Sequence, residues 1–122
     1  MYGPLAHGLL GGSFTPQTTF APDDWRSKSQ FFHGENLQRN VAVVEQLKRL
    51  ATREGMTIAQ LAIAWVLAQP AIDVAIVGAR NPEQLEQTAL AGDIHLTQET
   101  LQEIERIMHE AVPIGGPAPE GM

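Results

Sequence analysis

The residues with the clearest chemical potential are a glycine and an arginine in a turn that precedes a helix. Gly78 and Arg80 follow an apolar run at 72–77 and precede a helix start at 81–84 that carries asparagine, proline and glutamine in capping positions. Helix N-termini attract anions, a guanidinium can hold a phosphate through two hydrogen bonds, and a glycine lets that phosphate approach the backbone. The segment therefore indicates a phosphate site, although such residues also occur, and more often, in plain strand-to-helix turns.

The remaining reactive side chains give no catalytic motif. The sequence has no cysteine, which excludes disulfides, thiol catalysis and cysteine-type zinc sites. None of its four histidines matches a catalytic pattern. We interpret His7 as a loop or pocket-rim residue and the other three as surface residues. Asp23 and Asp24 could suggest an acid pair, but in a polar loop we expect them to be solvated.

Composition limits the class of protein. With 122 residues, 43% hydrophobic and 18% charged, the chain suits one small globular domain. Its net charge of −6 argues against a nucleic-acid binder. We expect no membrane span and no signal peptide, and with the lack of cysteine this indicates a cytoplasmic protein. Residues 2–6 look like the end of a buried strand directly after Met1, which predicts a truncated chain.

Periodicity and capping signals predict four main helices. Apolar residues at three- and four-residue steps mark a helix over 36–54. Thr57 begins a second helix, with glutamine in the capping-box position, and Pro70 prevents its continuation. The third helix runs from the start at 81–84 to about residue 91, and Thr97 caps the fourth.

Strand signals are fewer. The runs at 2–6 and 72–77 predict two parallel strands, the second covered on both faces, so the fold class is α/β. Two strands leave both sheet edges unpaired, so the chain pairs with something, packs unusually, or is a fragment. Residues 14–34 predict a long loop, and 113–122 a flexible tail. Aromatic residues either pin this loop to the body or make it a lid: Phe14, Phe20, Trp25, Phe31 and Phe32.

Four segments together resemble one family. Residues 2–10 (YGPLAHGLL) resemble the seventh-strand segment of the aldo-keto reductases, and residues 77–86 (VGARNPEQLE) resemble their eighth-strand turn. Residues 57–67 and 93–97 are similar to the neighbouring helix and loop, so the resemblance covers roughly residues 2–110. It implies that residues 1–112 are the C-terminal part of a (β/α)8 TIM barrel, an oxidoreductase that reduces aldehydes or ketones with NADP(H).

The resemblance also implies roles for individual residues. Tyr2 would stack on the nicotinamide, the segment from Pro4 to Gly8 would line the pyrophosphate path, and Arg80 with its neighbours would hold the 2′-phosphate. Gln87 and Thr88 stand where the family usually has glutamate and asparagine, which predicts weaker adenine recognition. The implied cofactor-binding residues are Tyr2, Pro4, Leu5, Gly8, Gly78, Ala79, Arg80, Gln84, Gln87 and Thr88.

The family's catalytic aspartate, tyrosine, lysine and histidine come from earlier strands and have no counterpart here. The one tyrosine, Tyr2, matches the stacking position. We therefore expect a segment that contributes cofactor binding, is inactive alone, and either pairs with the rest of the barrel or forms a homo-oligomer. The alternative is a non-enzymatic module that binds nucleotide or self-associates.

Overall fold

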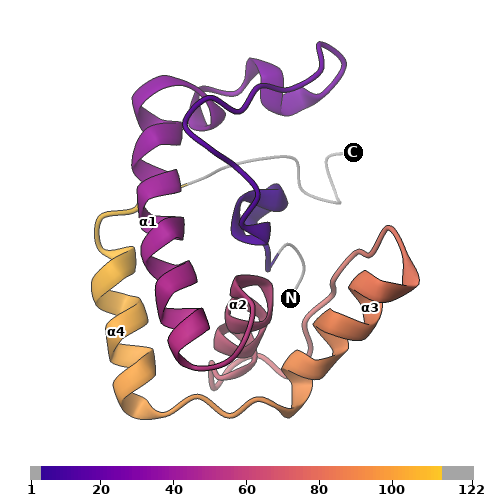
Figure 1. Cartoon of the computed structure of the whole chain (residues 1–122), viewed down its shortest axis with the longest axis vertical. Helices are drawn as coiled ribbons and strands as arrows, with labels where there is room; N and C mark the ends of the chain where they lie inside the picture. The colour runs from indigo at the N-terminus through magenta and orange to yellow at the C-terminus, as the bar shows by residue number, and fades with distance from the viewer. Residues whose placement is uncertain (1–3, 114–122) are drawn as a thin grey trace.

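The computed structural model describes residues 4–113, and the four predicted helices are found in it (Figure 1). The third helix is shorter than expected, because it ends at Ala89 and the chain continues as a short 3-10 helix. The α-helices are α1 (Gly34–Arg53), α2 (Ile58–Leu67), α3 (Pro82–Ala89) and α4 (Gln98–Met108). The 3-10 helices are η1 (Ala6–Gly11), η2 (Trp25–Lys28), η3 (Gln30–Phe32) and η4 (Leu90–Asp93).

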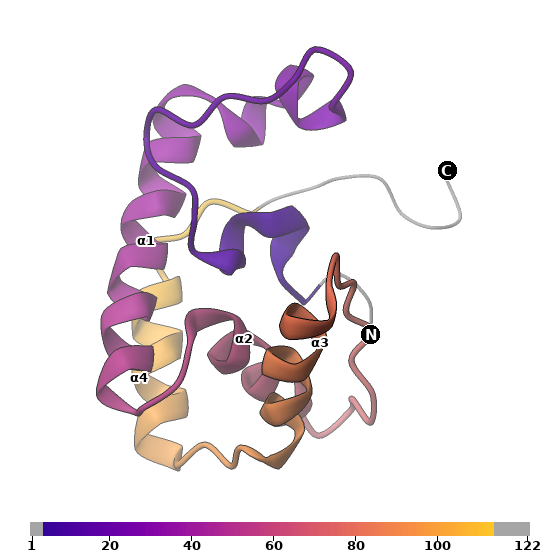
Figure 2. The same ribbon diagram turned by 45° about the vertical axis from the view of Figure 1, so that its right-hand side comes forward.

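The core lies between α1, α2, α4 and η1. The apolar face of α1 predicted from the sequence is buried, and Leu61 of α2, Ile104 of α4 and Leu9 of η1 pack into the same cluster. Helix α4 runs beside α1 in both views (Figures 1 and 2). Arg53 and Glu103 join the two helices through an ion pair of 2.6 Å. This hydrogen bond is the main cause of the raised pKa of Arg53 and the lowered pKa of Glu103.

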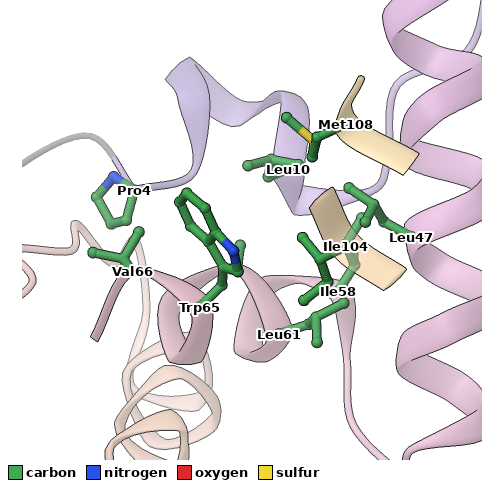
Figure 3. Close-up of a pocket in the computed structure, with 10 residues that line it drawn as sticks. Pro4, Leu10, Leu47, Ile58, Leu61, Trp65, Val66, Ile104 and Met108 are labelled. Atoms are coloured by element: carbon green, nitrogen blue, oxygen red, sulfur yellow. The ribbon is translucent and has the colours of Figure 1, made fainter. Parts of the chain in front are cut away.

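Helix α2 begins as its sequence predicts. The Thr57 side chain accepts a hydrogen bond from the Gln60 backbone, and the Gln60 side chain accepts one from the Thr57 backbone, which completes a capping box. The helix is less enclosed than its composition suggests. Beside Trp65 lies an apolar hollow of about 160 Å³, bordered by α1, α2, α4 and the N-terminal segment (Figure 3).

The prediction of two parallel strands is wrong for the part of the chain that the structure describes, residues 4–113. Residues 72–77 have only an isolated bridge at Ile76, and the side chains of Val74 and Ile76 are 63% and 64% exposed. The run was expected to be buried on both faces. A strand needs a neighbouring strand to accept and donate its backbone hydrogen bonds, and residues 4–113 contain no such neighbour. Of the other predicted strand, residues 1–3 are outside the described range and the chain enters η1 at Ala6.

The loop at 14–34 is tied together by its aromatic side chains. Phe20 packs edge-on against Phe14 and Phe32 with ring centroids 5.5 and 5.6 Å apart, and Trp25 meets Phe32 at 5.6 Å. Phe32 is fully buried. These contacts support the interpretation that the aromatics pin the loop to the body. Residues 114–122 of the predicted tail lie outside the described residues.

Candidate functional site

The turn before α3 carries the predicted phosphate-binding residues. The Asn81 side chain accepts a hydrogen bond from the Gln84 backbone at 2.8 Å, so it caps the helix as predicted. The Gln84 side chain in turn accepts one from the backbone N–H of Arg80, also at 2.8 Å. Sequence reasoning did not anticipate this second bond. It leaves the Arg80 guanidinium, not the Arg80 backbone N–H, to meet an anion.

Arg80 is exposed, and within residues 4–113 its guanidinium forms no ion pair. Gly78 and Ala79 are exposed too, and no heavy atom would lie within 4 Å of a Cβ added at Gly78. An unpaired guanidinium beside open backbone is well suited to a phosphate, because a carboxylate partner would have to be displaced first.

The N-terminal segment forms a tight left-handed turn. Ala6 and His7 have φ values of 50° and 57°, and Gly8 has a φ of 98°. Such values are rare for residues with a Cβ and persist only where the surroundings enforce them. The Leu5 carbonyl accepts hydrogen bonds from the backbones of Gly8 and Leu10, each at 3.1 Å. Tyr2, which was expected to stack on the nicotinamide, lies outside the described residues.

Arg26 of the long loop forms a hydrogen bond with this turn. Its Nη1 donates to the His7 carbonyl at 2.7 Å, and its Nε and Nη2 donate to the Asp24 carboxylate at 3.0 and 2.6 Å. The guanidinium lies 4.6 Å from the ring centroid of Phe20, within cation–π distance. A Cβ on Gly8 would come within 3.2 Å of Arg26 Nη1. The loop and the turn therefore support each other's geometry.

The expectation that Asp24 is solvated is wrong. Its side chain is 24% exposed and pairs with Arg26. Hydrogen bonds from the Arg26 side chain and backbone lower the Asp24 pKa from 3.8 to about 2. The same pairing raises the pKa of Arg26. Sequence reasoning missed Arg26 because its contact with His7 spans 19 positions. An Asp-X-Arg pair alone predicts a local ion pair and no more.

One cavity of about 820 Å³ joins the two segments and the loop. Pro4, Leu5 and Gly8 line it on one side, and the loop contributes Phe20 and Arg26. In Figure 2 the short helix η1 lies between this loop and α3. The residues from the second predicted segment that line the cavity are Gly78, Ala79, Arg80 and Gln84. His7 lies at the cavity wall, in agreement with its assignment to a pocket rim.

Gln87 and Thr88 do not line this cavity. The Gln87 carbonyl accepts a hydrogen bond at 2.8 Å from the side chain of Gln60 on α2. The Thr88 hydroxyl donates to the Gln84 carbonyl at 3.0 Å, within its own helix. A role for these two residues in adenosine binding stays a prediction.

Within residues 4–113, no group of three or more histidine, aspartate and glutamate side chains could hold a metal ion. No helix among those residues is both long enough and apolar enough to cross a membrane.

Comparison with known proteins identifies the family to which this chain belongs. The family described as the aldo/keto reductase family matches residues 1–109. An aldo-keto reductase of Gibberella moniliformis is 37% identical over 116 residues, which cover 93% of this chain and 35% of the relative. The aldo-keto reductase YhdN of Bacillus subtilis is 36% identical, over 94% of this chain and 36% of the relative. This chain belongs to the aldo/keto reductase family, whose members are oxidoreductases.

Two other relatives add detail. The aldo-keto reductase yakc [NADP(+)] of Schizosaccharomyces pombe is 32% identical over 98% of this chain and 35% of the relative. The glycerol dehydrogenase AKR11B4 of Gluconobacter oxydans superposes with a TM-score of 0.84 at 32% identity, over 97% of this chain and 36% of that structure. The chain therefore spans about a third of the length of the relatives it matches.

Proposed function

We propose that this chain is the C-terminal part of an NADP(H)-dependent aldo-keto reductase and supplies the cofactor-binding end of the barrel. The observation that carries the proposal is the shared cavity. Two segments some 70 positions apart, around Gly8 and Arg80, line one space together with the long loop. Its volume of about 820 Å³ is within the range of small-molecule and cofactor sites, roughly 300–1,000 Å³.

The charge distribution supports a phosphorylated cofactor. The chain is acidic overall, with a net charge of −6, so an anion site depends on local features such as a cationic side chain at a helix N-terminus. Arg26 is neutralised by Asp24. Arg80 has no such partner in residues 4–113 and faces the cavity from the N-terminal end of α3. We assign it to the 2′-phosphate of NADP(H), and the NADP(+) in the name of the Schizosaccharomyces pombe relative agrees with this assignment.

The proposal gives this chain no catalytic residue. Within the cavity Arg80, Gly78 and the turn at Gly8 would bind and orient the cofactor, which supplies the hydride when bound. The general acid that protonates the developing alkoxide would come from another part of the barrel. We therefore expect the isolated chain to reduce no aldehyde.

The alternative is a module that binds nucleotide or self-associates without catalysis. The exposed apolar run at 72–77 favours an association of some kind, since Ile76 is 64% exposed. In the complete barrel this run would pair with strands on both sides. Catalysis by a chain that includes the preceding two thirds of the relatives' length would exclude the alternative.

Chemical-shift mapping tests the proposal. NADP⁺ is added to the ¹⁵N-labelled chain, and we expect the amides of Gly8, Gly78 and Arg80 to shift together. Amides that border the apolar hollow, such as that of Trp65, serve as the internal control. Shifts confined to that hollow, or shifts at only one of the two segments, would contradict a shared cofactor site.

A further inference from the structure

Helix α3 carries the turn with Arg80, yet it buries nothing of its own. None of its eight residues is buried, and its Leu85 side chain is 58% exposed. Apolar packing therefore contributes little to its position. Its orientation must depend on the few polar contacts that join it to the rest of the chain, and on its continuation into η4, where Ala91 is fully buried.

The strongest of these polar contacts comes from Gln60 on α2. Gln60 is almost fully buried, and both the oxygen and the nitrogen of its side-chain amide form hydrogen bonds. Oε1 accepts the backbone N–H of Thr57 at 3.0 Å, within the capping box. Nε2 donates to the backbone carbonyl of Gln87 at 2.8 Å, near the C-terminal end of α3. The Gln87 Oε1 atom lies further away, at 3.4 Å.

We infer that Gln60 is a positioning residue that holds the Arg80 turn in place through α3. From Gln87 the connection runs up the helix to Gln84, whose side chain accepts the Arg80 N–H at 2.8 Å. A helix of this length transmits a shift at one end to the other, because its backbone hydrogen bonds make it stiff. We call the hydrogen bond from Gln60 to the Gln87 carbonyl the tether. Its consequence for the cofactor rests on the proposed function, whereas the tether itself does not.

Substitutions can test the tether and the helix cap separately, because the cap uses the oxygen of the Gln60 amide and the tether uses its nitrogen. Gln60→Glu keeps an oxygen for the Thr57 N–H, since glutamate also serves at this position of a capping box. The glutamate side chain cannot donate a hydrogen bond to the Gln87 carbonyl, and its negative charge repels the carbonyl oxygen. Thr57→Ala does the reverse, because it removes the hydroxyl that caps α2 and leaves the Gln60 amide free to reach α3.

The first readout needs no cofactor. We expect Gln60→Glu to raise hydrogen exchange of the α3 amides by about tenfold, since the Gln87 carbonyl loses the side-chain donor that joins α3 to α2. Thr57→Ala should raise exchange at the start of α2 and leave α3 as it was. Unchanged exchange in α3 in a folded Gln60→Glu chain would overturn the inference.

A second measurement uses the unaltered chain, in case Gln60→Glu does not fold. The side-chain NH₂ protons of Gln60 should exchange at least about tenfold more slowly than those of Gln102, an exposed glutamine of α4. Equal rates for the two glutamines would overturn the tether without any substitution.

The third readout is the ratio of NADH to NADPH dissociation constants. We expect Gln60→Glu to lower this preference for NADPH several-fold, and Thr57→Ala to leave it unchanged. An unchanged ratio together with a loosened α3 would overturn the positioning role. If the native chain binds both cofactors equally while α3 loosens as expected, the tether stands and the assignment of Arg80 to the 2′-phosphate fails.

Discussion

The left-handed turn at Gly8 shows how single residues shape the candidate site. Gly8 has a φ of 98°, and a Cβ there would meet Arg26 Nη1 at 3.2 Å and Phe14 Cζ at 3.4 Å. The backbone conformation favours glycine, and a Cβ would require the neighbouring side chains to move by a few tenths of an ångström. The arginine that crowds this position also donates a hydrogen bond to the His7 carbonyl. Turn and loop are therefore specified by the same contact.

We predict that Gly8→Ala lowers the free energy of unfolding by about 1–3 kcal/mol, because a left-handed non-glycine residue is strained. Gly11→Ala is the matched control, since its φ is ordinary and nothing lies within 4 Å of an added Cβ. Thermal unfolding followed by circular dichroism measures both. Equal melting temperatures for the two variants would show that the turn tolerates a side chain.

The ion pair between Asp24 and Arg26 predicts a response to acid. The Asp24 pKa is lowered in the folded state, from 3.8 to about 2. Its contribution to stability is therefore complete above pH 3.8 and is lost as the pH falls through about 2. Trp25, whose ring meets that of His7 at 5.0 Å, reports on the loop.

In a Trp65→Phe background, Trp25 emission should change between pH 3.8 and about 2, and Asp24→Asn should remove this transition. The Asp24→Asn chain should show the acid-state emission already at neutral pH. A transition in this window that survives the substitution would assign the acid response to other carboxylates.

At the scale of elements, helices were predictable and strands were not. Helix starts depend on local chemistry, and the side chains of Asn81, Thr57 and Thr97 cap their helices as the sequence indicates. A strand depends on a partner that its own residues do not encode. The run at 72–77 has the composition of a buried strand, yet Ile76 is 64% exposed, and residues 4–113 contain no neighbouring strand to cover it.

The candidate site divides in the same way. The turn at residues 78–84 could be predicted as a candidate phosphate site, because its glycine, its arginine and the helix start that follows them are contiguous in the sequence. The Gln60–Gln87 contact and the Arg26–His7 contact span 27 and 19 positions, and no local pattern indicates either. Gln60 was recognised only for its part in the capping box.

The hollow beside Trp65 allows a test of how α2 packs. Ala62 lines this space of about 160 Å³. Ala62→Leu should fill part of it, and cavity-filling substitutions commonly add about 0.5–2 kcal/mol to stability. Ala42→Leu, on the exposed side of α1, should change stability little. The midpoint of urea unfolding gives the comparison, and a lower midpoint for Ala62→Leu would mean that the hollow cannot accept the larger side chain.

At the scale of the whole molecule, this chain corresponds to about a third of its relatives. Helices α1, α2 and α4 form a core with η1, whereas the Val74 and Ile76 side chains of the run at 72–77 are 63% and 64% exposed. Exposed apolar surface favours association. We therefore expect the mass measured by light scattering to rise with concentration for the isolated chain.

Ile76→Lys should reduce that association, because it sets a charge in the exposed run. Ala42→Lys, on the exposed side of α1, is the control for added charge and should associate like the native chain. A native chain that stays monomeric at every concentration would show that the uncovered run does not mediate self-association.

The central claim is that Arg80 binds the 2′-phosphate of NADP(H), and titration of both cofactors tests it most directly. We expect Arg80→Ala to weaken NADPH binding by about ten- to a hundredfold, since hydrogen bonds to charged groups contribute roughly 1.5–3 kcal/mol. NADH binding should barely change, because NADH lacks that phosphate. Arg49→Ala, an exposed arginine of α1, should alter neither affinity. If Arg80→Ala weakens NADPH and NADH equally, Arg80 is a structural residue of the turn and the claim is contradicted.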